Sequence, residues 1–235
     1  IKTFKRQQKL RKNKHYFLSF NHSLKQHRFL FTYLISQSWI QQHAKVSMLL
    51  GTFDTPDGTG MIPPSPNAIK LLYMYGAHYG IETKKLQRFL ETLPWFVDEH
   101  NTNKFNPGSL GGLHDTEILY KDTVFSAVTE STEDWNPLPY LRMHLSEKTF
   151  KPMLFCHPLI ILGEPNINKT LSQINFCTYE NYFDLSFDNE QNDKKRIQGY
   201  FKSVEQACEE IQKNGFYNWI LQDIDTLEHN FYSYN

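Results

Sequence analysis

The stretch His15-Tyr-Phe-Leu-Ser-Phe20 is a run of mostly aromatic and aliphatic residues that is short enough for a buried strand. A polar turn follows it, and residues 24–41 then place apolar side chains at helical spacing. Residues 46–50 are short and apolar again, which predicts a second strand. A strand, a helix and a strand in this order are typical of a parallel sheet. We therefore expect an α/β protein with a Rossmann-like parallel sheet flanked by helices.

The rest of the chain is expected to add strands and helices after long irregular segments. Residues 51–66 are rich in Gly and Pro, and residues 101–112 in Asn and Gly, which predicts loops or insertions at both places. The other predicted elements are strands at 124–129, 159–162 and 176–178, the last of which would close the sheet, and helices at 67–79, 83–92, from 146, and at 166–174, 192–213 and 216–230.

Three parts of the chain are distinguished by composition and pattern. The first 14 residues contain seven Lys and Arg side chains, which is typical of a solvated arm or linker, although such a run can also contact nucleic acid. Residues 15–190 are expected to form a Rossmann-like domain with loop insertions, and residues 191–235 a C-terminal helical cap. The chain begins with Ile1 rather than Met, which suggests a fragment.

The overall composition excludes several classes of protein. Its 25 basic and 25 acidic residues balance, so no global field draws the 235-residue chain to nucleic acid or to an anionic membrane. No apolar run is long enough to span a bilayer, and we expect no membrane span. Three distant cysteines predict neither a disulfide framework nor a metal pair, which favours the cytoplasm, or the host cytoplasm if the protein is viral. These are Cys156, Cys177 and Cys208.

Ligands of open parallel sheets bind beyond the carboxyl ends of the strands, and three junctions of this kind carry polar residues. Asn21 follows the first strand, and the next helix carries His27 and Arg28 in its first turns, where helix amides and a guanidinium could clamp a diphosphate. Glu130 leaves the strand at 124–129, where its carboxylate could accept hydrogen bonds from sugar hydroxyls. The alternatives are an ion-paired surface arginine and a turn-capping loop.

A third junction begins at Ser146, which is a good N-cap residue and is followed by Glu147 in the first helical turn. Lys148 and Lys151 lie three residues apart on one face of the predicted helix, at an end where cations oppose the helix dipole. Pro152 adds a further local cost by removing a backbone hydrogen bond. An anionic ligand would explain this pattern, and a solvated basic helix start is the alternative.

Together these segments resemble the sugar-nucleotide-binding domain of α-1,3-fucosyltransferase-like enzymes and of related glycosyltransferases from phages and large viruses. The shared features are a strand and turn before a helical Arg, a strand ending in an acidic sequence, a Ser-Glu-Lys triplet that opens a helix, a Pro-apolar-Gly-x-Pro stretch, and an aromatic-acidic segment. In this chain they are residues 17–21 with Arg28, then 128–131, 146–148, 158–165 and 182–188.

The resemblance implies that residues 15–190 are the donor-binding lobe of a GT-B glycosyltransferase, with a nucleoside diphosphate sugar as its donor. Arg28 and Lys148 would hold the diphosphate, Glu147 the ribose hydroxyls, and Glu130 the transferred sugar or its ribose. Because fixed cations and helix amides can stabilise the leaving diphosphate, we expect neither a metal nor a cofactor. The full set of donor-binding candidates is Asn21, Arg28, Glu130, Ser146, Glu147, Lys148, Thr149 and Lys151.

The acceptor and the catalytic base stay open. The acceptor could be a glycan, a protein or a modified nucleic-acid base. The family's N-terminal lobe, which supplies the base, is not evident, so the base would lie upstream or in the loops at 51–66 and 98–116, where the candidates are Asp54, Asp57, His100 and His114.

Two other functions would fit the same sequence. One is a noncatalytic nucleotide-sugar-binding module. The other is an interaction protein that docks a partner through its C-terminal aromatic residues, although their position in a predicted helix favours a role in the core. These aromatic residues are Phe216, Tyr217, Trp219, Phe231, Tyr232 and Tyr234.

Overall fold

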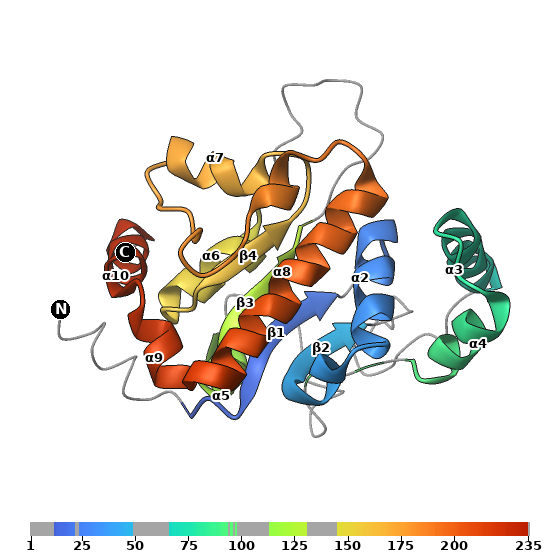
Figure 1. Ribbon diagram of the computed structural model, residues 1–235, viewed down its shortest axis with the longest axis horizontal. Coiled ribbons are helices and arrows are strands. Elements are labelled where there is room, and N and C mark those ends of the chain that lie inside the picture. The colour runs from blue at the N-terminus through green and yellow to red at the C-terminus, as the bar shows by residue number, and fades with distance from the viewer. Residues whose placement is uncertain are drawn as a thin grey trace.

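The centre of the protein is a parallel sheet of four strands in the order β2-β1-β3-β4 (Figure 1). The computed structural model describes residues 12–21, 24–48, 66–93, 95, 97, 113–130 and 145–234, with side chains from residue 117 in the segment that begins at 113. The strands are β1 (His15–Asn21), β2 (Ala44–Met48), β3 (Thr123–Thr129) and β4 (Leu159–Leu162). The expected α/β class and the Rossmann-like parallel sheet are confirmed.

The strands in the middle of the sheet are the most deeply buried. All seven residues of β3 are buried, because the strand has β1 on one side, β4 on the other and helices above and below. Its register pairs Phe125 with Phe17 of β1 and Thr129 with Leu162 of β4. The carboxyl ends of the strands therefore meet along one edge of the sheet.

Helices cover both faces of the sheet. Successive residues of β1 point to opposite faces. On one face Phe17 stacks on Phe125 and belongs to the main core, over which α2 (Gln26–Ser36) packs against α8 (Asp193–Asn214). On the other face Leu18 packs with Tyr120 of α5 (Leu113–Asp122). Tyr120 in turn stacks on Phe155, just after α6 (Glu147–Leu154), which places α5 and the end of α6 together on that face.

The C-terminal helices complete the core. Trp219 of α9 (Phe216–Leu221) is 2% exposed and packs against Phe125 of β3. Phe231 of α10 (Ile224–Tyr234) is also buried, whereas Tyr217, Tyr232 and Tyr234 are exposed. The core role expected for the C-terminal aromatic residues is thus confirmed for Trp219 and Phe231. No helix within the described ranges is long and apolar enough to cross a membrane.

Two predicted boundaries near the N-terminus are wrong. The helix expected at 24–41 ends at Ser36, whose hydroxyl bonds the Tyr33 carbonyl. A separate 3-10 helix, η1 (Trp39–His43), follows it and is capped by the Ser38 side chain. The strand expected at 46–50 starts two residues earlier, at Ala44, directly after η1. Polar side chains that bond nearby backbone groups ended the helix before its apolar pattern did.

The strand expected at 176–178 is absent, since these described residues have no regular structure and do not pair with the sheet. The side chain of Asn230 accepts from the Cys177 amide at 2.7 Å and donates to the Cys177 carbonyl at 3.0 Å. A buried amide from α10 thus takes the place of a neighbouring strand. The helix expected at 216–230 divides into α9 and α10, and α5 was not predicted.

The remaining elements differ from their expected bounds by a few residues at most. They are α3 (Pro66–His78), α4 (Thr83–Glu91) and α7 (Ile167–Gln173). A 3-10 helix, η4 (Ser186–Asn189), was not predicted.

Candidate functional site

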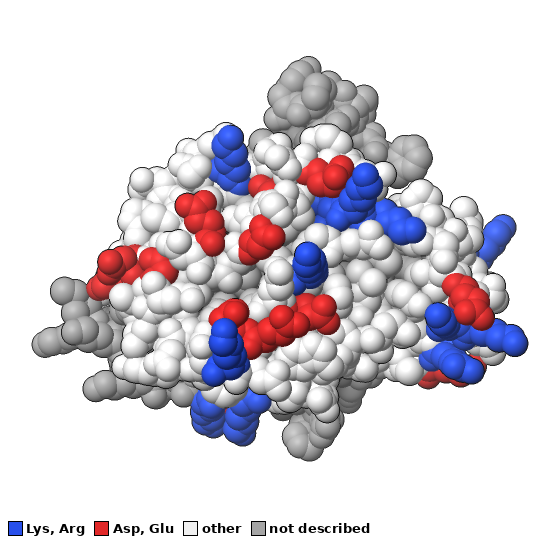
Figure 2. All heavy atoms as spheres, viewed as in Figure 1, with Lys and Arg blue, Asp and Glu red and all other residues white. Residues whose placement is uncertain are grey.

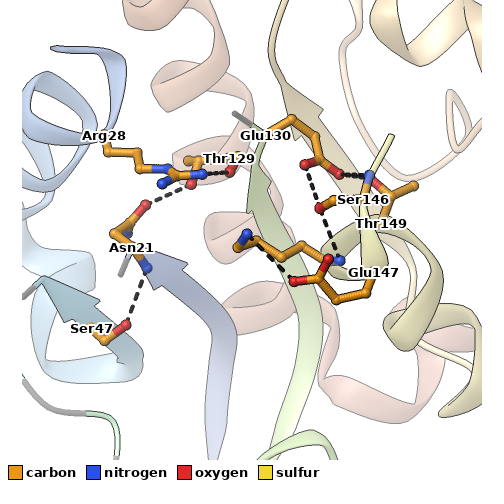
Figure 3. A network of polar contacts seen from close by, with 9 residues as sticks. Asn21, Arg28, Ser47, Thr129, Glu130, Ser146, Glu147 and Thr149 are labelled. Atoms are coloured by element: carbon orange, nitrogen blue, oxygen red, sulfur yellow. Dashed lines mark hydrogen bonds and ion pairs between the residues drawn. The ribbon is translucent and has the colours of Figure 1, made fainter. Parts of the chain in front are cut away.

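The switch point of the sheet lies between the ends of β1 and β3. From β1 the chain passes through α2 to β2, on one side of β1, and the later strands β3 and β4 lie on the other side. The direction in which strands are added therefore reverses between β1 and β3. The Thr129 hydroxyl donates to Oδ1 of Asn21 at 2.6 Å, and the backbone N–H of Asn21 donates to the Ser47 hydroxyl of β2 at 3.1 Å (Figure 3). Ligands of doubly wound sheets bind at such a point, so its surroundings are the candidate site.

The start of α2 faces this point with an unusual charge pattern. Its N-cap residue is Lys25, whose ammonium can only donate and makes no side-chain cap. No acidic residue lies in the first turn, which instead carries His27 and Arg28. Cations here oppose the positive end of the helix dipole. This helix start is therefore suited electrostatically to an anion.

Arg28 is the most deeply buried cation at the switch point, with 1% of its side chain exposed. Its guanidinium donates to the carbonyl of Thr129 at 2.9 Å. Burial lowers the pKa of Arg28 from 12.5 to about 10, and the nearby carboxylates of Glu130 and Glu147 oppose this shift. The guanidinium is consequently charged at neutral pH and lies within electrostatic range of the first turn of α6.

Glu130 connects the end of β3 to the start of α6. Its carboxylate accepts from the Ser146 amide at 2.8 Å, the Ser146 hydroxyl at 2.6 Å and the Thr149 hydroxyl at 2.6 Å. The side chain is 1% exposed. The Ser146 hydroxyl also caps Lys148, as expected for an N-cap residue. An internal carboxylate thus occupies the α6 N-terminus, which leaves Glu130 suited to position α6.

The charged residues of α6 remain accessible. The side chains of Lys148 and Glu147 are 22% and 52% exposed, and their charged groups lie 3.7 Å apart. Lys151 is half-buried and lies in the last turn, because α6 has only eight residues. A cation in the last turn of a helix is favoured by the helix dipole. Of the two lysines that the sequence placed at the unfavourable N-terminal end, only Lys148 therefore lies there.

The sequence did not single out His27 as a site residue, yet it lies beside Arg28 and is 8% exposed. Its Nε2 is 2.7 Å from the carbonyl oxygen of Glu130. Burial and the charge of Arg28 lower the pKa of His27 to about 3. The signal in the sequence was its position next to Arg28 on the first turn of α2, where both side chains reach toward β3.

Two further buried polar groups support the same edge of the sheet. Arg196 of α8 donates to the carbonyls of Gly163 at 3.0 Å and Glu190 at 2.8 Å. The Asp188 carboxylate accepts from the side chain of Asn168 at 2.8 Å and from its backbone amide at 3.2 Å, at the start of α7. The aromatic-acidic segment of the sequence therefore has a structural role through Asp188.

The candidates for a catalytic base are not placed. Asp54, Asp57 and His100 lie outside the described residues, and so does the side chain of His114. Within the parts that are described, no three His, Cys, Asp or Glu side chains group as a metal site requires. On the face that carries α8, basic and acidic side chains are interspersed (Figure 2).

Of the eight predicted donor-binding residues, seven surround the switch point and the adjoining first turn of α6, and Lys151 lies one turn further along that helix. A scan of protein-family models found no match, and searches of curated proteins and of solved structures also found none. The assignment of function therefore rests on the geometry and charge of this edge of the sheet.

Proposed function

We propose that the protein binds a nucleoside diphosphate sugar at the carboxyl ends of β1 and β3 and is the donor-binding lobe of a GT-B glycosyltransferase. The observation that carries the proposal is the start of α2, where the cations Lys25 and Arg28 meet the switch point without an acidic residue in the first turn. Cations at this end of a helix raise its free energy unless an anion is bound. A diphosphate supplies such an anion.

The two helices at this edge support different parts of the donor. The N-terminus of α6 already holds the Glu130 carboxylate, so the diphosphate is expected at the start of α2, with Lys148 reaching it from α6. Glu147 is exposed and acidic, which suits the hydroxyls of the ribose or of the sugar. In transfer, fixed cations beside the leaving diphosphate would stabilise its developing charge.

Calorimetric titration with GDP, UDP, ADP and CDP tests the binding. We expect heat from at least one of them, and about tenfold weaker binding by Lys25→Ala and by Lys148→Ala, because each loses one charge contact to phosphate. Lys202→Ala is the matched control, since Lys202 is an exposed lysine of α8. Absence of heat from all four nucleotides would contradict the proposal.

A second measurement separates a transferase from a noncatalytic binder. Many glycosyl transfers proceed slowly to water, so release of the free nucleoside diphosphate from the matching sugar donor is the expected activity. Lys148→Ala should slow this release more than Lys202→Ala does. Tight binding of the donor without any release would favour the noncatalytic nucleotide-sugar-binding module.

A further inference from the structure

The backbone and side chain of Glu130 form a junction of four elements. Its amide donates to the Leu162 carbonyl of β4 at 2.9 Å, its carbonyl lies 2.7 Å from Nε2 of His27 on α2, and its carboxylate bonds Ser146 and Thr149 at the start of α6. Glu130 itself follows β3. Glu130 therefore links the start of α6 to the start of α2.

His27 is the part of this junction that belongs to α2. A carbonyl oxygen can only accept, so Nε2 of His27 carries the hydrogen and donates it. Its neighbour Arg28 donates to the preceding carbonyl, that of Thr129. Two successive side chains of α2 thus hold two successive carbonyls at the end of β3, and Figure 3 shows the Arg28 contact beside the Glu130 bridge.

We infer that His27 is a positioning residue of the donor site: as an uncharged donor it fixes the Glu130 carbonyl, and through the Glu130 bridge it sets Lys148 of α6 opposite the start of α2. This inference rests on the proposed function. It assigns no contact between His27 and the ligand. The effect of His27 on binding is transmitted through Glu130 and Ser146 to Lys148.

The surroundings of His27 explain why an uncharged donor occupies the position. Burial disfavours a protonated ring, as do the charges of Arg28 and Lys25 at the start of α2 and of Arg196 on α8, whereas the bond to the Glu130 carbonyl favours it. A lysine or arginine at position 27 would add a further buried cation, which is costly without a paired carboxylate. A neutral imidazole supplies the hydrogen bond without that charge.

A double-mutant cycle tests the inference with the nucleoside diphosphates used above. We expect His27→Leu to weaken binding about tenfold and His27→Gln, which keeps a donor, to restore most of the affinity. In a Lys148→Ala background, His27→Leu should cause less than about a twofold further loss, because the two residues act in one chain of contacts. A residue that only stabilised the fold would lower affinity equally in both backgrounds.

His229→Leu is the matched control. His229 also places Nε2 against a backbone carbonyl, that of Asn175, but it is exposed and lies on α10. If His27→Leu does not fold, Thr149→Val cuts the same bridge from the α6 side and should show the same coupling to Lys148.

The outcomes distinguish the two proposals. No binding of any nucleotide by the unaltered protein overturns the proposed function and this inference together. Binding by the unaltered protein that His27→Leu leaves unchanged overturns the inference alone, and so does equal loss in both backgrounds. If Thr149→Val replaces His27→Leu in the test, unchanged binding by that variant overturns it as well.

Discussion

The Thr129 hydroxyl donates to Oδ1 of Asn21 at 2.6 Å, which joins the last residues of the two strands on either side of the switch point. Both residues are fully buried, with an exposed fraction of 0%. The geometry of the candidate site depends on this contact, since Arg28 is fixed to the Thr129 carbonyl and Glu130 comes next in the chain.

Thr129→Val should lower the free energy of unfolding by about 1–3 kcal/mol, because it leaves the buried side-chain oxygen Oδ1 of Asn21 without its donor. Urea unfolding followed by circular dichroism measures the change. Ser172→Ala is the control: its hydroxyl is exposed and bonds only within α7, so a change within about 0.5 kcal/mol is expected. Equal stabilities of the Thr129→Val variant and the unaltered protein would show that the contact does not secure the strand ends.

Asn230→Ala should destabilise the protein by about 2–4 kcal/mol, because both backbone groups of Cys177 lose their partner. Hydrogen exchange provides a local measurement, since the Cys177 amide should exchange faster in the variant. Asn218→Ala removes an exposed amide that bonds only the Asn214 carbonyl and should have little effect on stability. An unchanged exchange rate at Cys177 would argue against this account of the missing strand.

His27 should make stability depend on pH in a defined direction. The pKa of its ring is about 3 in the folded protein and 6.5 in the unfolded chain, so the unfolded chain binds more protons between these values. The contribution of His27 to the free energy of unfolding is complete above pH 6.5. It is lost as the pH falls toward 3, by up to about 1.4 kcal/mol per pH unit.

Urea midpoints at pH 7, 5.5 and 4.5 check this expectation. His27→Gln should flatten the dependence relative to the unaltered protein. His15, whose pKa burial also lowers, contributes in the same direction to both proteins, so the difference between them isolates His27. Parallel pH profiles for the two proteins would mean that His27 is not a buried neutral imidazole.

Gly199→Ala should destabilise the protein by about 1–3 kcal/mol through overpacking. A Cβ atom at this position of α8 would lie 2.6 Å from Cβ of Phe187 in η4, an atom that cannot move without its backbone. Thermal unfolding measures the effect, with Lys202→Ala on the same helix as the control. A variant as stable as the unaltered protein would show that η4 shifts freely away from α8.

The sequence predicted the elements whose signal is local. The runs at β1, β3 and β4 were found within one residue of their observed starts, because strands that are buried on both faces consist mostly of apolar or small side chains. The cap at Ser146 was also found, since its hydroxyl acts within its own helix. The arrangement of Asn21, Arg28 and Glu130 at one edge followed from the rule for parallel strands.

The tertiary structure alone decided which partners those polar groups take. Nothing in the local sequence tells that the Glu130 carboxylate bonds Ser146 and Thr149, because the residues that bond it are 16 and 19 positions away. The same holds for Asn230, whose side chain satisfies both backbone groups of Cys177 across 53 positions.

By itself, then, the amino-acid sequence determined the class of fold and the edge of the sheet at which polar residues gather. Folding decided that Glu130 is engaged within the protein, that Lys151 lies at the favourable end of a short helix, and that His27 lies against the Glu130 carbonyl. The physical reason is range: apolar periodicity and capping act within a few residues, whereas the partner of a buried polar group is whichever donor or acceptor the packed chain brings to it.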